Sequence, residues 1–306
     1  MLISVACGSD DSDDAMIDDP IIEDPTDHPV DDLMVTTFVS NLAANDALTM
    51  DADGNLYVSN YGTYNPSTFS GTGTTVVKVT PEGTPSTFIS GLTGPVGGVI
   101  DGDGNFYVNS GNNFSAGDLI KVNPSGTKST LTSIEGYPSG ILINDDNSLY
   151  VANYQKSIIS KVDQDGTVTE FASDPSLFGG VGIAFDDDKN ILVGNFTSGK
   201  ILSITPDGSE VSLIATIPTV VEESVIGYIT YFEGHIYATG IGAHRIYKVS
   251  LDGTLEVYAG NGQNESKDGT LKEASFTNPN GILVDKTNRV LYVSEGNGNI
   301  RTLPIE

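Results

Sequence analysis

One short phrase recurs six times along this chain of 306 residues and limits the folds open to it. It reads Leu-Thr-Met-Asp-Ala-Asp-Gly-Asn-Leu-Tyr-Val-Ser-Asn at 48–60 and Val-Ile-Asp-Gly-Asp-Gly-Asn-Phe-Tyr-Val-Asn-Ser at 99–110. The equivalent positions, separated by 50, 43, 42, 45 and 55 residues, are Tyr57, Tyr107, Tyr150, Leu192, Tyr237 and Tyr292. A repeat of that length, built from short strands and tight turns, is typical of a β-propeller with one blade per repeat.

Each repeat predicts four strands. In the first, 46–51 and 56–59 flank a turn in which Gly54 supplies a positive φ, and 75–80 and 86–90 flank a second turn. Alternating β-branched and aromatic residues in these segments suit a half-buried sheet. No helix of normal length is predicted, and 271–275 could form at most one turn. The fold class is therefore all-β.

The sixth repeat lacks a fourth strand, because the chain stops soon after the third one at 300–305. A spare strand at 34–40 contains Thr-Phe-Val-Ser, which is similar to the fourth strands of other repeats. We expect this strand to complete the last blade and to close the ring, which removes open sheet edges. Residues 34–306 then form a six-bladed propeller with about 45 residues per blade.

The most specific sequence lies near the end of the chain. Ala-Gly-Asn-Gly at 259–262, Asn-Pro-Asn-Gly-Ile-Leu-Val-Asp at 278–285 and Leu-Tyr-Val-Ser-Glu-Gly-Asn-Gly-Asn-Ile-Arg at 291–301 resemble the hallmark of the NHL repeat. Gly-Ala-His-Arg-Ile-Tyr-Lys-Val at 242–249 resembles its third strand. The resemblance covers 34–306 and implies the NHL-repeat and gluconolactonase-like (SMP-30-like) group of six-bladed propellers. That group includes binding proteins as well as metal-dependent lactonases and esterases.

Residues 1–33 differ in character from the repeats. Residues 1–7 are short and apolar, end in the only cysteine, Cys7, and resemble the truncated tail of a bacterial lipoprotein signal whose cysteine would be lipidated. Residues 8–33 hold eleven carboxylates and no Lys or Arg, so they predict an extended acidic tether. We expect an exported protein, lipid-anchored at the bacterial outer membrane or cell surface. The alternative is an ordinary disordered terminus with a chance cysteine.

Charge excludes one class of partner. The chain carries 14 basic and 41 acidic residues, a formal charge of −27, and the propeller alone retains about −16 after the eleven tether carboxylates are removed. Nucleic-acid binding needs a basic surface to neutralise phosphates, and none is present. Trp is absent, although 13 Tyr and 11 Phe remain for stacking. We expect a monomer that meets the membrane only through its lipid anchor.

Two sets of residues are expected to reach the propeller channel. The residues just before the inner strands are Asp46, Gly97, Ser139, Val181, Ile226 and Asn280. Those that end the second strands are Asn60, Ser110, Asn153, Asn195, Gly240 and Glu295. The Asp-Ala-Asp-Gly-Asn and Asp-Gly-Asp-Gly-Asn phrases lie between strands and lack the later acidic ligand of an EF-hand, so they predict hairpin turns.

The resemblance to the lactonase branch implies a metal held near the channel by Glu, Asn and Asp side chains. The candidate ligands are Asp46, Asn60, Asn153, Asn195, Asn280 and Glu295. Their oxygen atoms suit a divalent hard cation such as calcium. However, the apolar Val181 and Ile226 stand where that branch would offer polar ligands, and an Asn that ends a second strand also bonds neighbouring backbone in ordinary repeats.

Three functions remain open from the sequence. The first is a surface-tethered, non-catalytic propeller that binds a small molecule or a protein through its channel face. The second is an SMP-30-like metal-dependent lactonase or esterase, in which Glu295 or Asp46 would be a metal ligand or catalytic base. The third is a structural spacer. The incomplete ligand set favours the first.

Overall fold

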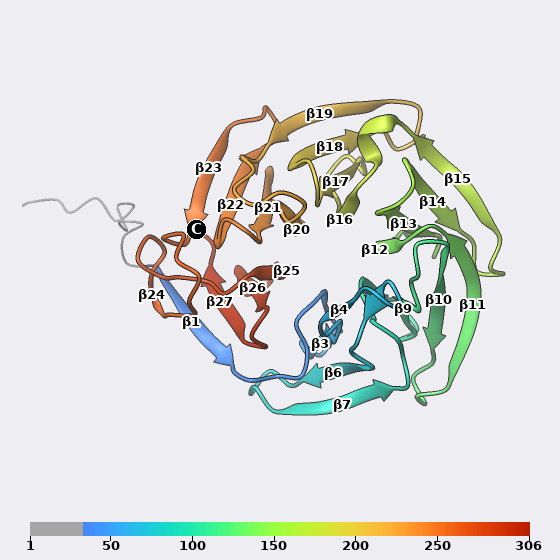
Figure 1. Cartoon of the computed structure of the whole chain (residues 1–306), viewed down its shortest axis with the longest axis horizontal. Helices are drawn as coiled ribbons and strands as arrows, with labels where there is room; N and C mark the ends of the chain where they lie inside the picture. The colour runs from blue at the N-terminus through green and yellow to red at the C-terminus, as the bar shows by residue number, and fades with distance from the viewer. Residues whose placement is uncertain (1–32) are drawn as a thin grey trace, which may run out of the picture.

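The computed structural model describes residues 33–306 as a ring of six four-stranded antiparallel sheets around a central channel (Figure 1). The predicted all-β, six-bladed propeller is confirmed. Within 33–306 the one helical element is the short 3-10 turn η2 (Pro175–Leu177). No helix in this range is long and apolar enough to cross a bilayer.

The first three blades follow one another along the chain, each running from its inner to its outer strand. Blade 1 comprises β2 (Leu48–Met50), β3 (Leu56–Ser59), β6 (Thr75–Val79) and β7 (Pro85–Ser90). Blade 2 comprises β8 (Gly98–Ile100), β9 (Phe106–Ser110), β10 (Ala116–Val122) and β11 (Lys128–Glu135). Blade 3 comprises β12 (Pro138–Ile143), β13 (Leu149–Asn153), β14 (Ile158–Val162) and β15 (Val168–Ser173).

The last three blades repeat this order, and the sixth borrows its outer strand. Blade 4 comprises β16 (Gly180–Phe185), β17 (Ile191–Asn195), β18 (Lys200–Ile204) and β19 (Val211–Thr216). Blade 5 comprises β20 (Ile226–Phe232), β21 (His235–Gly240), β22 (Arg245–Ser250) and β23 (Leu255–Ala259). Blade 6 comprises β25 (Pro279–Asp285), β26 (Val290–Glu295), β27 (Ile300–Pro304) and β1 (Met34–Val39).

The ring closes as the sequence predicts. Strand β1 pairs antiparallel with β27, with Thr36 opposite Thr302 and Thr37 opposite Arg301. Its other edge pairs with the two-residue strand β24 (Gly269–Thr270), which the sequence did not indicate. The first and last parts of the propeller are thereby joined in one sheet, and β24 covers the start of the outer edge of β1.

The recurrent phrase forms the turn between the first two strands of a blade. In blade 1 the Asp51 carboxylate accepts hydrogen bonds from the backbone N–H groups of Asp53 and Asn55 and from the Tyr57 hydroxyl. In blade 2 Asp101 makes the same bonds to Asp103, Asn105 and Tyr107. The predicted hairpin turns are confirmed, and in blades 1 and 2 the marking tyrosine ties the second strand to the turn.

A ring of small residues lets the inner strands approach one another. A Cβ atom on Gly140 would lie 2.3 Å from the Val181 backbone oxygen of the next blade, and one on Gly281 would lie 2.3 Å from that of Asp46. The equivalent positions in the six blades are Ala47, Gly97, Gly140, Gly182, Gly227 and Gly281. Their missing side chains allow backbone to pack on backbone around the channel.

Apolar side chains fill the space between neighbouring blades. One cluster joins Leu192 and Ile201 of blade 4 to Ile229 and Ile236 of blade 5, all at most 4% exposed. Successive strand residues point to opposite faces, so each sheet contributes side chains to the clusters on both of its sides. The packed blades form a fixed frame for the loops at the ends of the channel.

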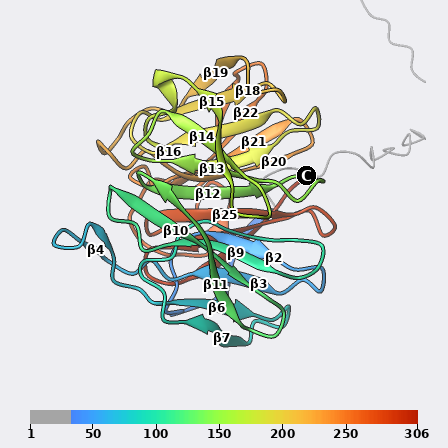
Figure 2. The same ribbon diagram turned by 90° about the vertical axis from the view of Figure 1, so that its right-hand side faces the viewer.

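Two parts of the chain need separate mention. The loop after β3 carries a small hairpin, β4 (Tyr64–Asn65) and β5 (Ser70–Gly71), which the sequence predicted only as a loop. Figure 2 shows β4 standing out from the body of the propeller. Residues 1–32 lie outside the described part of the chain, and with them the proposed signal ending at Cys7 and almost all of the tether at 8–33.

Candidate functional site

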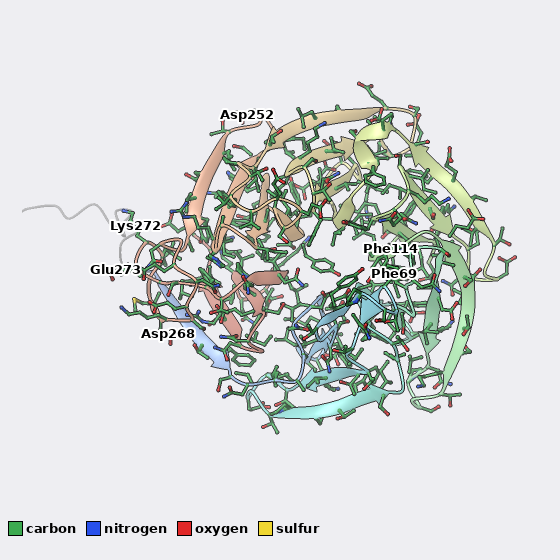
Figure 3. The ribbon with its side chains drawn as sticks, in the orientation of Figure 1. Phe69, Phe114, Asp252, Asp268, Lys272 and Glu273 are labelled. Atoms are coloured by element: carbon green, nitrogen blue, oxygen red, sulfur yellow. The ribbon has the colours of Figure 1, made fainter. Side chains whose placement is uncertain are left out.

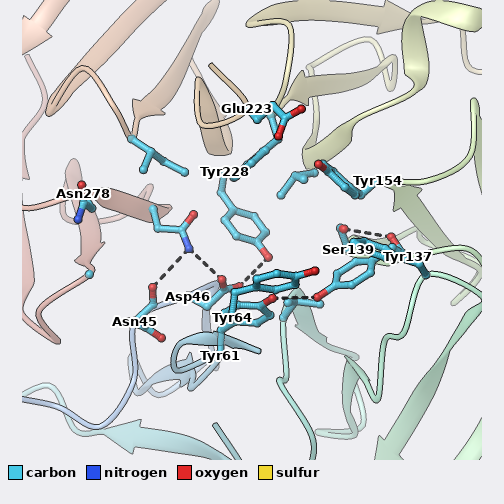
Figure 4. A pocket seen from close by; sticks show the side chains of 17 residues that line it. Asn45, Asp46, Tyr61, Tyr64, Tyr137, Ser139, Tyr154, Glu223, Tyr228 and Asn278 are labelled. Carbon is cyan, nitrogen blue, oxygen red and sulfur yellow. Dashed lines mark hydrogen bonds between the residues drawn. The ribbon is translucent and has the colours of Figure 1, made fainter. Parts of the chain in front are cut away.

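A cavity of about 550 Å³ lies at the channel mouth where the inner strands begin, and residues of all six blades line it (Figure 4). Seven aromatic side chains form most of its wall: Tyr61, Tyr64, Phe114, Tyr137, Tyr154, Phe196 and Tyr228. Its other lining residues are Asn45, Asp46, Val96, Ser139, Val181, Glu223, Ile241, Asn278, Asn280 and Gly296.

The position of a residue within its repeat decides whether it reaches this cavity. The residue that precedes the ring of small residues lines it in five blades, as Asp46, Val96, Ser139, Val181 and Asn280. The residue one position beyond the strand end expected from the sequence also lines it in five blades, as Tyr61, Tyr154, Phe196, Ile241 and Gly296. Register shifts in β12, β16, β20 and β25 bend the starts of these inner strands, where bulges can re-aim side chains.

Four rings of the aromatic wall, those of Phe114, Tyr137, Tyr154 and Phe196, form a connected set. The ring of Phe114 lies 5.4 Å from that of Tyr137, and Tyr154 lies 6.0 Å from Tyr137 and 5.8 Å from Phe196. The ring of Phe69, at the β4–β5 hairpin, lies 5.3 Å from that of Phe114. Figure 3 labels both residues on the same side of the propeller. Tilted and edge-to-face contacts at these distances are favourable, so these four rings support one another before any ligand arrives.

The floor of the cavity is a single carboxylate. Asp46 is 6% exposed and accepts hydrogen bonds from its neighbour's backbone, Ala47 N–H, at 2.8 Å and from the Tyr228 hydroxyl at 2.8 Å. The side-chain amide of Asn280 donates to its other oxygen at 2.8 Å. Blades 5 and 6 thus hold a side chain that blade 1 contributes, and the Tyr228 ring spans the channel to reach it (Figure 4).

Burial governs the ionisation of these groups. Loss of water raises the pKa of Asp46 to about 6, although its three hydrogen bonds favour the charged form. Burial, together with the nearby Asp46 charge, also raises the pKa of the hydroxyls of Tyr61, Tyr137 and Tyr228. At neutral pH the buried Asp46 carboxylate is therefore mostly ionised and lies among neutral tyrosines.

Only two of the six candidate ligands come together in this cavity, Asp46 and Asn280. The other three asparagines bond elsewhere. The amide nitrogen of Asn153 donates to the Glu135 backbone oxygen of blade 2, and that of Asn195 donates to the Phe178 backbone oxygen in the connection between blades 3 and 4. Asn60 donates to the Thr75 hydroxyl of its own blade at 3.3 Å. The amide oxygens of Asn153 and Asn195 accept from backbone N–H groups just after the second strand and brace the turn there.

Glu295 lies in a separate buried network in blade 6. It is fully buried, and its carboxylate accepts from the Thr277 backbone N–H at 2.8 Å, from the Ser266 hydroxyl, and from the Arg301 guanidinium at 3.2 Å. Arg301 also pairs with Asp268 at 2.7 Å. Glu295 therefore does not line the cavity in which a ligand or base was expected, and its hydrogen bonds lie within the blade that closes the ring.

The arrangement does not fit the metal that the family resemblance implies. Calcium needs six or more oxygen ligands, whereas hydrogen-bond donors surround the Asp46 carboxylate, and the nitrogen of Asn280 faces it. Within 33–306, no group of three His, Cys, Asp or Glu residues could hold a metal ion. The six predicted ligands therefore do not form one coordination set. The asparagines chosen at the strand ends stand one position before the residues that face the channel, and successive side chains point to opposite sides.

The aromatic wall went unrecognised in the sequence, although its signal was present. Tyr61, Tyr154 and Phe196 each stand one position beyond the asparagines that were singled out at the expected ends of the second strands. Successive side chains in a strand point to opposite sides. The asparagine therefore braces the loop, whereas the aromatic residue after it faces the channel. Tyr228 carries no such repeated signal.

Comparisons with known proteins support the fold and extend no further. No protein-family model matches the chain, and no curated protein matches its sequence. Among solved structures, an auxiliary nutrient binding protein from Bacteroides thetaiotaomicron is 15% identical with a TM-score of 0.72, covering 89% of this chain and 76% of that one. A gluconolactonase from Xanthomonas campestris is 12% identical with a TM-score of 0.68, covering 90% of both chains.

A third similar structure is virginiamycin B lyase from Staphylococcus aureus, which is 17% identical with a TM-score of 0.62. The match covers 90% of this chain and 99% of that one. Proteins with such different printed activities share the propeller, so the likeness shows the fold alone, and any function has to be argued from the site.

Proposed function

We propose that this chain is a non-catalytic binding protein that holds a small organic molecule in the cavity at the channel mouth. The observation that carries the proposal is the cavity itself: about 550 Å³, with seven aromatic rings on its wall and one hydrogen-bonded carboxylate on its floor. Ligand pockets of drug-sized molecules have this size and this mixture of apolar wall and few polar groups. The nutrient-binding protein among the similar structures is in keeping with the proposal.

The polar groups of the cavity suit the binding of a ligand better than a chemical reaction on it. Asp46 is occupied by donors from three segments, and the Ser139 hydroxyl donates to the Tyr137 backbone oxygen at 3.2 Å instead of to a base. A nucleophile needs an adjacent base to be activated. A binding site needs only fixed donors, acceptors and stacking surfaces.

A lactonase or esterase is the second candidate, and Asp46 is the observation that favours it. A carboxyl group whose pKa is raised to about 6 can accept a proton from water near neutral pH, which suits a general base. A gluconolactonase is among the similar structures, which is in keeping with this second candidate function. If this second function is correct, the wild-type chain should hydrolyse a lactone or ester, and Asp46→Asn should lower the rate at least a hundredfold.

The test of binding is a thermal-unfolding screen with sugars, amines, amino acids, lactones and esters. A ligand bound at the mouth raises the unfolding temperature of the wild-type chain, and Phe114→Ala and Tyr154→Ala weaken its effect. Leu213→Ala, an exposed outer-strand substitution on β19, is the matched control and should leave it unchanged. If the ligand raises the unfolding temperature of both aromatic variants as much as that of wild type, it binds elsewhere and the proposal is contradicted.

Surface anchoring through Cys7 is a further part of the proposal and is supported by sequence alone. The apolar residues 1–7 end at Cys7, and the acidic residues that follow suit a tether between membrane and propeller. Expression in a Gram-negative host with a complete signal should place the wild-type chain in the membrane fraction, and Cys7→Ser should release it. Recovery of the wild-type chain in the soluble fraction contradicts anchoring.

A further inference from the structure

The cavity carries negative charge without any positive counterpart. Its two ionisable acids are Asp46 on the floor and the exposed Glu223 at the rim, and no Lys, Arg or His is among its lining residues. The groups that face Asp46 are the Tyr228 hydroxyl, the Asn280 amide and its neighbour's backbone N–H, with Tyr61 and Tyr137 close by. All of these groups are neutral near pH 7.

A buried carboxylate with no cationic partner is unusual in a folded protein, because the charge has lost most of its water. Within 33–306, none of the ion pairs involves Asp46. The buried Glu295 shows the contrast, since it has Arg301 at 3.2 Å. Asp46 is thus an anion without a cationic partner at the base of an open cavity, and a cation bound in that cavity would be attracted to it.

The walls above Asp46 favour the same kind of ligand. Aromatic rings present a negative face that attracts ammonium groups within about 6 Å of the ring centre. Tyr61 and Tyr137 are joined by their hydroxyl groups at 3.1 Å, and Tyr228 and Tyr154 stand around the same opening (Figure 4). The propeller's acidic charge adds a long-range attraction for cations.

We propose that the ligand of this cavity is an organic cation, a small molecule whose ammonium group lies among the tyrosine rings close to Asp46. The inference rests on the proposed binding function and names the class of its ligand. A neutral sugar could also stack on the rings, but it would leave the Asp46 charge uncompensated. The ammonium group supplies the missing charge and contacts the ring faces at the same time.

The ionisation of Asp46 gives the proposal a pH signature. A cation attracts the charged carboxylate, so binding favours loss of the Asp46 proton and weakens as this carboxylate becomes protonated. With a pKa of about 6 in the free protein, the affinity for a permanently charged ligand should be constant above about pH 7. It should fall toward tenfold for each pH unit below about pH 6.

The experiment compares two ligands of the same shape that differ in charge: choline and 3,3-dimethyl-1-butanol. A second pair, phenethylamine and phenethyl alcohol, tests a primary ammonium group. Titration of the full chain is followed by tyrosine emission, because the chain has no Trp and five of its 13 tyrosines line the cavity. We expect at least one cation to bind about tenfold or more tightly than its neutral partner.

Two variants locate the charge that is responsible. Asp46→Asn should abolish the preference for the cation, and Glu223→Gln should reduce it only at low salt because this side chain is exposed. Asp252→Asn is the matched control: it removes one exposed charge on the outer edge of blade 5, far from the cavity (Figure 3), and should change nothing. The comparison of the two wild-type ligands remains decisive even if a variant unfolds.

The outcomes separate this inference from the function on which it rests. If neutral partners or sugars bind as tightly as the ammonium compounds, or if neither ammonium compound binds while sugars do, the organic-cation proposal is overturned and the binding function stands. If the chain binds no member of any ligand class in the thermal screen, both proposals fail. A cation preference that survives in Asp46→Asn also overturns the inference.

Discussion

Asp46 should cost the folded protein stability at neutral pH, and Asp46→Asn measures how much. Burial raises the pKa of Asp46 from its ordinary 3.8 to about 6 in the folded chain. Because each pKa unit corresponds to 1.36 kcal/mol, ionisation of this group destabilises the fold by about 3 kcal/mol once both states are charged. The folded state binds this proton more tightly than the unfolded state does. Stability therefore falls as pH rises from about 4 to about 6, and the penalty is complete above that range.

The test uses the difference between wild type and Asp46→Asn at two pH values. An asparagine bears no charge, so the variant lacks the pH-dependent penalty, while the remaining carboxylates contribute equally to both proteins. Going from pH 5 to pH 8, the free energy of unfolding of Asp46→Asn should rise relative to wild type by about 1.5 kcal/mol. Any steric or hydrogen-bond cost of the substitution is the same at both pH values and cancels.

Urea unfolding at pH 5 and pH 8, followed by tyrosine emission and circular dichroism, provides the two differences. Asp252→Asn, whose carboxylate is fully exposed, is the control and should show no pH-dependent difference beyond about 0.5 kcal/mol. A constant difference for Asp46→Asn, or one that shrinks toward pH 8, would refute the argument that this carboxylate is charged, buried and uncompensated.

Two further substitutions test the frame that holds the site. Gly140→Ala should destabilise the propeller by about 2 kcal/mol or more in urea unfolding, because its Cβ would lie 2.3 Å from a backbone oxygen of the next blade. In the control Gly102→Ala the new Cβ meets nothing within 4 Å, so the free energy of unfolding should change by less than about 0.5 kcal/mol. Arg301→Met should cost about 3–5 kcal/mol, because it leaves the buried Glu295 carboxylate without its cation. Arg289→Met, which breaks a solvent-exposed pair, should cost less than about 1 kcal/mol, and equal losses from the two arginines would contradict the assigned role of the blade 6 network.

The fold was predictable because its signals are local and repeated. Asp51 and Tyr57 sit within one hairpin, so their hydrogen bonds follow from a few residues of sequence. Ring closure was the one long-range prediction, and it could be made because 34–40 repeats the pattern of the fourth strands. Strand β24 and the β4–β5 hairpin escaped prediction since they are two-residue strands in polar loops.

The site was predictable only in part, for a geometric reason. Asp46 and Asn280 were identified because they precede inner strands, and the structure places them in hydrogen-bond contact. Val96 lines the channel where Gly97 had been expected, which is again one step of register. The hydrogen bond between Asp46 and Tyr228 joins residues 182 apart in sequence and depends on how blades 1 and 5, with blade 6 between them, are placed around the channel. No local pattern encodes that contact.

The proposed function depends on binding of a small molecule in the aromatic cavity at the channel mouth. Calorimetric titration of the best ligand from the thermal screen into wild type, Tyr154→Ala and Leu213→Ala measures this binding. We expect saturable one-to-one binding to wild type, an affinity at least tenfold weaker in Tyr154→Ala, and no change in Leu213→Ala. Equal affinity in all three proteins, with Tyr154→Ala still folded, would contradict it.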